Sequence, residues 1–207
     1  ARLSETDVWT TSFWRAVFCA QCLTLVLVAI ELRASLRTVL AMGRPGAIVA
    51  FLLSVDAILF IVALDHTSVA NALFIMATTP FIAAVLGRVV LKERVRPKTW
   101  VATGFAFLGI ALMVSGSLGR GSLLGDGLAF VVTVNFAIAM ILMRRHRHIN
   151  MRPTVWLSAI ISVILTVPLA SPLAVTAVNM GVLVVFGVVE MGLGLVLFTA
   201  GAQRVPP

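Results

Sequence analysis

The chain has 207 residues, of which 60% are hydrophobic and only 12% are charged, with a mean hydropathy of +1.09. Soluble domains average about 25% charged residues, so this composition excludes an ordinary soluble domain. The net charge is +8. It lies in short stretches between apolar blocks, as membrane-topology signals do, so we interpret it as a topology signal rather than a nucleic-acid site.

The apolar blocks are about 20 residues long, which is the length that spans a bilayer as a helix. Their residues do not alternate with polar ones, which excludes a transmembrane β-barrel. We therefore predict an all-α, polytopic bundle of transmembrane helices. Seven spans are expected in chain order, roughly at 14–30, 46–64, 68–87, 99–116, 124–143, 154–170 and 181–200.

Basic residues concentrate on alternate loops, and therefore on one side of the predicted membrane spans. The loops 31–45, 88–98 and 144–153 hold three, five and four of the 16 Lys and Arg residues. The positive-inside rule predicts that these loops are cytoplasmic. The first span then runs from outside to inside.

The two cysteines, Cys19 and Cys22, form a C-x-x-C pair inside the first apolar block. A redox or metal site of this type needs accessibility and further ligands. We interpret the pair as small helix-packing residues, and we expect no metal and no cofactor. The chain begins at Ala1 and ends on "QRVPP" just after an apolar block, so we expect a fragment of a longer protein.

An internal repeat is visible in the order of the spans. A Trp followed nine residues later by Leu-Thr occurs at Trp14 and again at Trp156, and "GAIVAF" (46–51) resembles "GVLVVF" (181–186). The repeated spans run in opposite directions because each repeat holds an odd number of spans. Inverted repeats of this kind are typical of secondary transporters, which bind their substrate near the membrane midplane.

Three stretches resemble one transporter family, the EamA-type drug/metabolite transporters. They are "NALFIMATTPFIAAVLGRVVLKERV" (71–95), "TWVATGFAFLGIALMVSG" (99–116) and "GDGLAFVVTVNFAIAMILMRR" (125–145). The resemblance implies ten helices in two inverted five-helix repeats, of which this chain holds helices two to eight. Residues 1–116 would be the first repeat without its first helix. Residues 117–207 would begin the second repeat with three helices, so the fold is incomplete at both ends.

Two carboxylates lie deep in predicted spans, Asp56 and Glu190, the eleventh of 19 and the tenth of 20 residues. An ionised carboxylate at the membrane centre costs about 2.5–3.5 kcal/mol on insertion scales, so such groups usually face a protein interior or a water-filled cavity. We interpret them as candidates for a proton or substrate pathway. The alternative is a structural hydrogen bond across a helix interface.

Pro80 interrupts the span 68–87 and removes one backbone hydrogen bond, which Thr78 and its neighbour can compensate. We predict a kinked or broken helix beside the transport pathway, against the alternative of a tolerated membrane proline. Asn71 and Asn135 are further polar candidates for the pathway.

The expected function is secondary transport of small metabolites or amino acids by alternating access, as an exporter of the cell inner membrane and not an enzyme. Proton coupling remains open. The alternatives are an intramembrane lipid-modifying enzyme and a non-transporting membrane assembly protein. The expected partners are the lipid bilayer and a small-molecule substrate, with protons and a second copy of the chain as candidates; no nucleic acid is expected.

Overall fold

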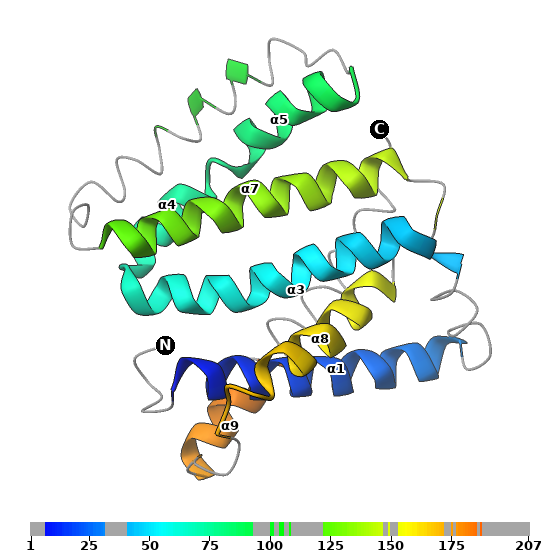
Figure 1. Cartoon of the computed structure of the whole chain (residues 1–207), viewed down its shortest axis with the longest axis vertical. Coiled ribbons are helices and arrows are strands. Elements are labelled where there is room, and N and C mark those ends of the chain that lie inside the picture. The colour runs from blue at the N-terminus through cyan, green and yellow to red at the C-terminus, as the bar shows by residue number, and fades with distance from the viewer. Residues whose placement is uncertain are drawn as a thin grey trace. The chain divides into compact units, whose positions relative to one another are not determined.

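The structure, a computed structural model, consists of helices and their connections throughout the residues it describes (Figure 1). These are residues 7–31, 41–92, 100–101, 104–105, 108, 122–146, 149, 153–171, 175, 177–185 and 187. The helices are α1 (Val8–Glu31), α3 (Gly43–His66), α4 (Val69–Met76), α5 (Thr79–Val90), α7 (Leu123–Arg145), α8 (Pro153–Thr166) and α9 (Ala177–Val185).

Three stretches of the described chain are long and apolar enough to cross a membrane: 43–66, 69–90 and 123–145. They match the predicted spans 46–64, 68–87 and 124–143 and confirm a polytopic helical bundle. The predicted spans 99–116 and 181–200 lie largely outside the described residues, so the inverted repeat and the division at residue 116 stay predictions.

Helix α8 ends at Thr166, four residues before the predicted end of its span. The reason is Pro168, which lies two residues later in a turn. Proline disfavours the helical conformation of the residue before it and cannot donate a helical hydrogen bond.

The chain divides into two compact units, Ala1–Ser54 with His148–Pro207, and Val55–Arg147. In the first unit, α1 and α8 pack against each other in opposite directions. The start of α8 meets the end of α1, where Trp156 Nε1 donates to Thr24 Oγ1 at 2.8 Å. Just beyond the end of α8, the Ser171 amide donates to Thr10 Oγ1 at 3.0 Å.

A line of buried hydroxyl residues follows α8 at every fourth position: Thr154, Ser158, Ser162 and Thr166. Thr166 Oγ1 donates to the Ser162 carbonyl at 2.7 Å and Ser162 Oγ to the Ser158 carbonyl at 2.9 Å. Ser162 Oγ also reaches the Ser54 carbonyl of α3 at 3.4 Å. Small residues whose hydroxyls are satisfied within the helix let two helices approach closely.

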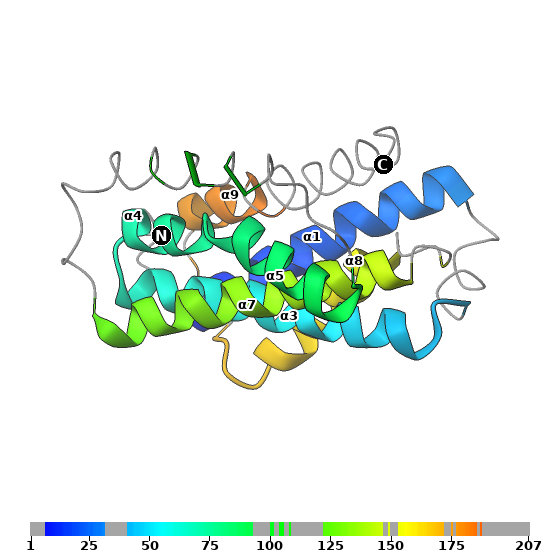
Figure 2. The ribbon, with the colours of Figure 1, turned by 90° about the horizontal axis from the view of Figure 1, so that it is seen from above.

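In the second unit, α4 and α5 both pack along α7 (Figures 1 and 2). The second half of α3 runs antiparallel to α7, because the end of α3 meets the start of α7 and its middle meets the middle of α7. A cluster of fully buried alanines, Ala63, Ala72 and Ala129, lies where α3, α4 and α7 meet. These small side chains allow the three backbones to lie close together.

Gly125, in the first turn of α7, marks the closest approach in this unit. A Cβ atom there would lie 2.6–2.8 Å from backbone atoms of His66 and Thr67, in the turn between α3 and α4. Ser122 caps α7 by accepting from the Gly125 amide at 3.1 Å. Its own hydroxyl donates to the His66 carbonyl at 2.8 Å. The junction of α3, α4 and α7 is therefore held by backbone contact.

Candidate functional site

A buried polar pair connects the middle of α3 with the middle of α7. Asp56 is 7% exposed, and Asn135 Nδ2 donates to its Oδ1 at 2.7 Å. The second carboxylate oxygen, Oδ2, is buried without a hydrogen-bond partner in the described part of the chain. A buried acceptor left unsatisfied costs about 1–3 kcal/mol, which favours a role beyond packing. Two residues that the sequence singled out separately are thus brought together.

A second polar cluster lies where α3, α4 and α7 meet. Asp126 Oδ1 accepts from Thr67 Oγ1 at 2.5 Å and from Asn71 Nδ2 at 3.4 Å. Asn71 is 3% exposed, and its Oδ1 atom is buried without a partner among the described residues. The sequence predicted Asn71 as a pathway residue but did not single out Asp126, which lies near the end of its span. Gly125, which directly precedes Asp126, is the signal that could have indicated it, because a glycine permits the close backbone approach seen at this junction.

The helix that contains Pro80 is broken, as predicted. Helix α4 ends at Met76 and α5 begins at Thr79, with Pro80 in its first turn. Thr78 Oγ1 donates to the Ile75 carbonyl at 2.6 Å, and Thr79 Oγ1 donates to the Met76 carbonyl at 2.5 Å. The hydroxyls therefore satisfy carbonyls at the break, as Thr side chains do beside membrane prolines. Whether the break borders a pathway stays a prediction.

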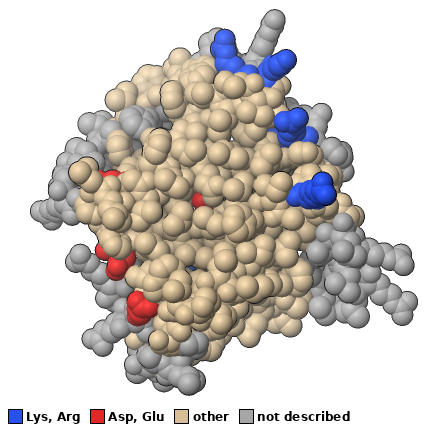
Figure 3. All heavy atoms as spheres, viewed as in Figure 1, with Lys and Arg blue, Asp and Glu red and all other residues tan. Residues whose placement is uncertain are grey.

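Charge is divided between the two ends of the second unit. Asp65 and Asp126 lie at the end where α4 and α7 begin. The described basic side chains lie at the opposite end, on the last turns of α5 and α7 and just after α5: Arg88, Lys92, Arg144 and Arg145. Figure 3 shows most visible Asp and Glu atoms on the left and the visible Lys and Arg atoms at the top and on the right. This division agrees with the orientation that the basic loops predict.

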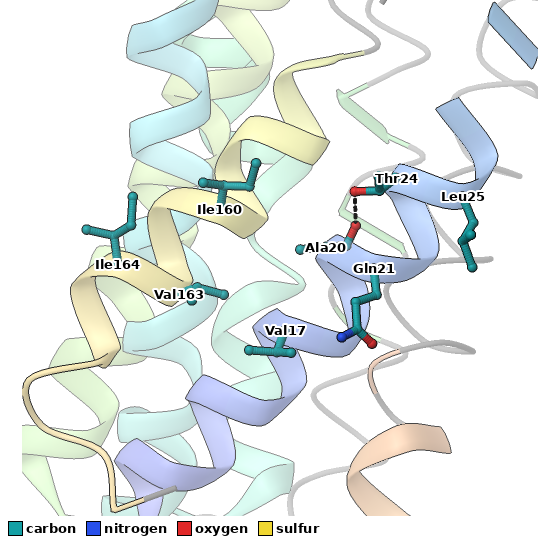
Figure 4. Close-up of a pocket in the computed structure, with 8 residues that line it drawn as sticks. All are labelled: Val17, Ala20, Gln21, Thr24, Leu25, Ile160, Val163 and Ile164. Atoms are coloured by element: carbon teal, nitrogen blue, oxygen red, sulfur yellow. Dashed lines mark hydrogen bonds between the residues drawn. The ribbon is translucent and has the colours of Figure 1, made fainter. Parts of the chain in front are cut away.

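The first unit contains an open groove of about 580 Å³ between α1 and α8 (Figure 4). Its lining is apolar apart from Gln21 and Thr24, and the Thr24 hydroxyl donates to the Ala20 carbonyl of its own helix at 2.7 Å. Leu25 and Ile164 at this groove are 70% and 64% exposed. Such a surface suits hydrocarbon rather than water, and none of the predicted pathway residues that the structure describes lines it.

Glu190, the second deep carboxylate of the sequence, lies outside the described residues. Gly187, which precedes it by three positions, is described and packs directly on α1. A Cβ atom at Gly187 would lie 2.6 Å from Phe18 Cβ and 3.0 Å from the Arg15 carbonyl oxygen. This glycine therefore permits a close approach of the chain to α1.

These features define a class of protein. Several apolar helices, a broken membrane helix and buried polar groups between helices are typical of a multi-pass membrane transporter.

Comparison with known proteins identifies the family. The profile of the EamA-like transporter family matches residues 1–115, and the chain belongs to this family. Its members are transporters rather than enzymes. A stretch of 92 residues is 35% identical to the "Uncharacterized transporter YyaM" of Bacillus subtilis (strain 168), covering 42% of this chain. The chain matches 30% of the length of that relative. No solved structure matches the chain.

Proposed function

We propose that this transporter exports small metabolites or amino acids across the cell inner membrane by alternating access, and that Asp56 carries the coupling proton. The observation that supports the proposal is the buried carboxylate of Asp56, which has one oxygen engaged by Asn135 and the other without a described partner. The substrate class and the outward direction follow the resemblance to drug/metabolite transporters and are part of the proposal. The orientation rests on the alternation of basic loops.

The Asp56–Asn135 pair suits proton transfer because the two carboxylate oxygens of Asp56 differ in their hydrogen bonding. Asn135 Nδ2 donates to Oδ1 and holds the carboxylate in one orientation. Oδ2 then remains as the acceptor for a proton. An uncharged carboxyl group is tolerated at the membrane centre far better than a carboxylate, so a closed state favours the protonated form. Opening to one side lets water reach the group and take the proton.

The break between α4 and α5 supplies a second element of the proposed mechanism. Pro80 has no amide hydrogen to donate to the Met76 carbonyl, which accepts from Thr79 Oγ1 instead, and the Ile75 carbonyl accepts from both the hydroxyl and the amide of Thr78. Broken helices recur at the substrate sites of transporters, where one half moves while the other stays fixed. We place Pro80 and Thr78 at such a joint, with Asn71 on the half that is hydrogen-bonded to α7 through Asp126.

The proposed partners are the lipid bilayer, the small-molecule substrate and protons. A second copy of the chain is a further candidate partner. Cross-linking of the protein in native membranes would detect such a dimer, and a monomer only would argue against it.

The test is transport in proteoliposomes that contain a mixture of radiolabelled amino acids. We expect an imposed pH gradient to accelerate efflux by the native protein, and Asp56→Asn to abolish this acceleration. Asp65→Asn is the matched control, because Asp65 is 58% exposed and its recorded ion-pair contact is to the neighbouring His66. An Asp56→Asn protein with an unchanged response to the gradient would refute the proton-coupling role.

A further inference from the structure

The cluster of Asp126, Thr67 and Asn71 has features that helix capping does not explain. The first amides of α4 and α7 already have their caps, since the Asn71 amide donates to Ser68 Oγ and the Gly125 amide to Ser122 Oγ, both at 3.1 Å. The Asp126 side chain is not needed for this purpose. It nevertheless accepts two hydrogen bonds on one oxygen atom.

This cluster has more hydrogen-bond acceptor sites than donors that could satisfy them. Asn71 Oδ1 is buried and lacks a partner among the described residues, although its side chain is turned toward Asp126 through Nδ2. Folded proteins rarely bury an acceptor that nothing satisfies. Thr67 is 9% exposed, and its hydroxyl oxygen keeps lone pairs after donating its proton to Asp126. The cluster therefore presents a carboxylate, an amide oxygen and a hydroxyl oxygen.

The charge at this end of the unit is not balanced by nearby cations. In the described part of the chain, no Lys or Arg lies within ion-pair distance of Asp126. The described basic side chains of this unit lie at its opposite end. Asp126 is half-buried, so its carboxylate can be reached from solvent. Hard oxygen ligands with a single negative charge suit a small cation of single charge.

We propose that Asp126, Thr67 and Asn71 bind a monovalent cationic group. The group is either a free sodium ion or the ammonium group of a substrate. Each satisfies the Asn71 amide oxygen and compensates the Asp126 carboxylate. The sodium alternative is independent of the proposed function, whereas the ammonium alternative rests on an amine-bearing substrate. The site lies on different residues from the Asp56–Asn135 pair, so each proposal can fail without the other.

The experiment measures equilibrium binding of radioactive sodium and of radiolabelled methylammonium to the purified protein in detergent, with N-methylglucamine chloride holding the ionic strength constant. We expect saturable binding of one of the two probes. Asp126→Asn should weaken it by at least about tenfold, because the variant removes the charge of the direct partner. It keeps an oxygen that accepts from Thr67, so the junction should remain folded. Asp65→Asn, at the same end of the unit, should bind as the native protein does.

The outcomes separate the two sources of the cation. Sodium binding that methylammonium does not displace assigns the site to a free ion, and methylammonium binding without sodium binding assigns it to a substrate amine. Asn71→Ala is the second variant, and it should weaken binding of the same probe while leaving the Thr67 bond to Asp126 in place. Absence of saturable binding for both probes would overturn the proposal. So would equal binding by the native protein and a folded Asp126→Asn variant.

Discussion

Gly125→Ala should destabilise the second unit, because the added Cβ atom meets backbone rather than a flexible side chain. The nearest atoms are the His66 carbonyl carbon at 2.6 Å, the Thr67 amide nitrogen at 2.7 Å and the His66 carbonyl oxygen at 2.8 Å. Ordinary contacts between such atoms lie at about 3.5–4.0 Å, so the first turn of α7 must move away by about 1 Å.

That movement weakens specific hydrogen bonds. The His66 carbonyl accepts from Ser122 Oγ at 2.8 Å and from the Ser122 amide at 3.2 Å. A shift of about 1 Å takes both beyond good hydrogen-bond geometry. Each contributes about 1 kcal/mol. The expected loss in the free energy of unfolding is therefore about 2–3 kcal/mol, within the range seen for overpacked sites.

The assay is unfolding of the purified protein in detergent, followed by circular dichroism. Gly127→Ala is the matched control on the same helix, because a Cβ atom there has nothing within 4 Å. It should stabilise the protein by roughly 0.5–1 kcal/mol, the usual gain of Ala over Gly inside a helix. If Gly125→Ala is as stable as Gly127→Ala, the close approach of α7 to the turn between α3 and α4 is wrong.

Three further predictions concern hydrogen bonds and the helix break. Asn135→Ala should lower stability by about 1–3 kcal/mol, because Asp56 loses its donor; a double-mutant cycle with Asp56→Ala should show strong coupling, and simple additivity would argue against the pair. Trp156→Phe and Thr24→Val should each cost about 1 kcal/mol in thermal unfolding, and the double variant should cost no more than either alone. Pro80→Ala should change stability by less than about 1 kcal/mol, since proline is tolerated in a first helical turn, but should slow transport in proteoliposomes; an unchanged rate would show that the break is dispensable.

The long apolar helices were predictable because bilayer length constrains them strongly. Helix α3 begins three residues before its predicted span 46–64 and ends two residues after it, and α7 exceeds 124–143 by one and two residues. The break before Pro80 was predictable from the chemistry of proline and its threonine neighbours. The early end of α8 was missed because its apolar pattern continues past Thr166, although Pro168 stops the helix.

The sequence indicated how deep in its span Asp56 lies, but not that Asn135 is its hydrogen-bond partner. Asp56 and Asn135 are 79 residues apart. Which face α7 turns toward α3 depends on helix packing, which periodicity within one helix does not determine. Asp126 was missed for the same reason, since its partners Thr67 and Asn71 come from a turn and a helix 59 and 55 residues away in sequence. A search for acidic residues in the middle of a predicted span finds Asp56 but misses an acidic residue at a junction of helices, such as Asp126.

The central claim is that Asp56 lies on an alternating-access pathway, and labelling of a cysteine at this position tests it most directly. Cys19→Ala and Cys22→Ala remove the described free thiols first. Asp56→Cys is then exposed to a membrane-impermeant thiol reagent from each side of oriented vesicles. The account predicts labelling from both sides, with substrate shifting the balance from one side to the other. A folded variant that stays unlabelled from both sides would contradict it.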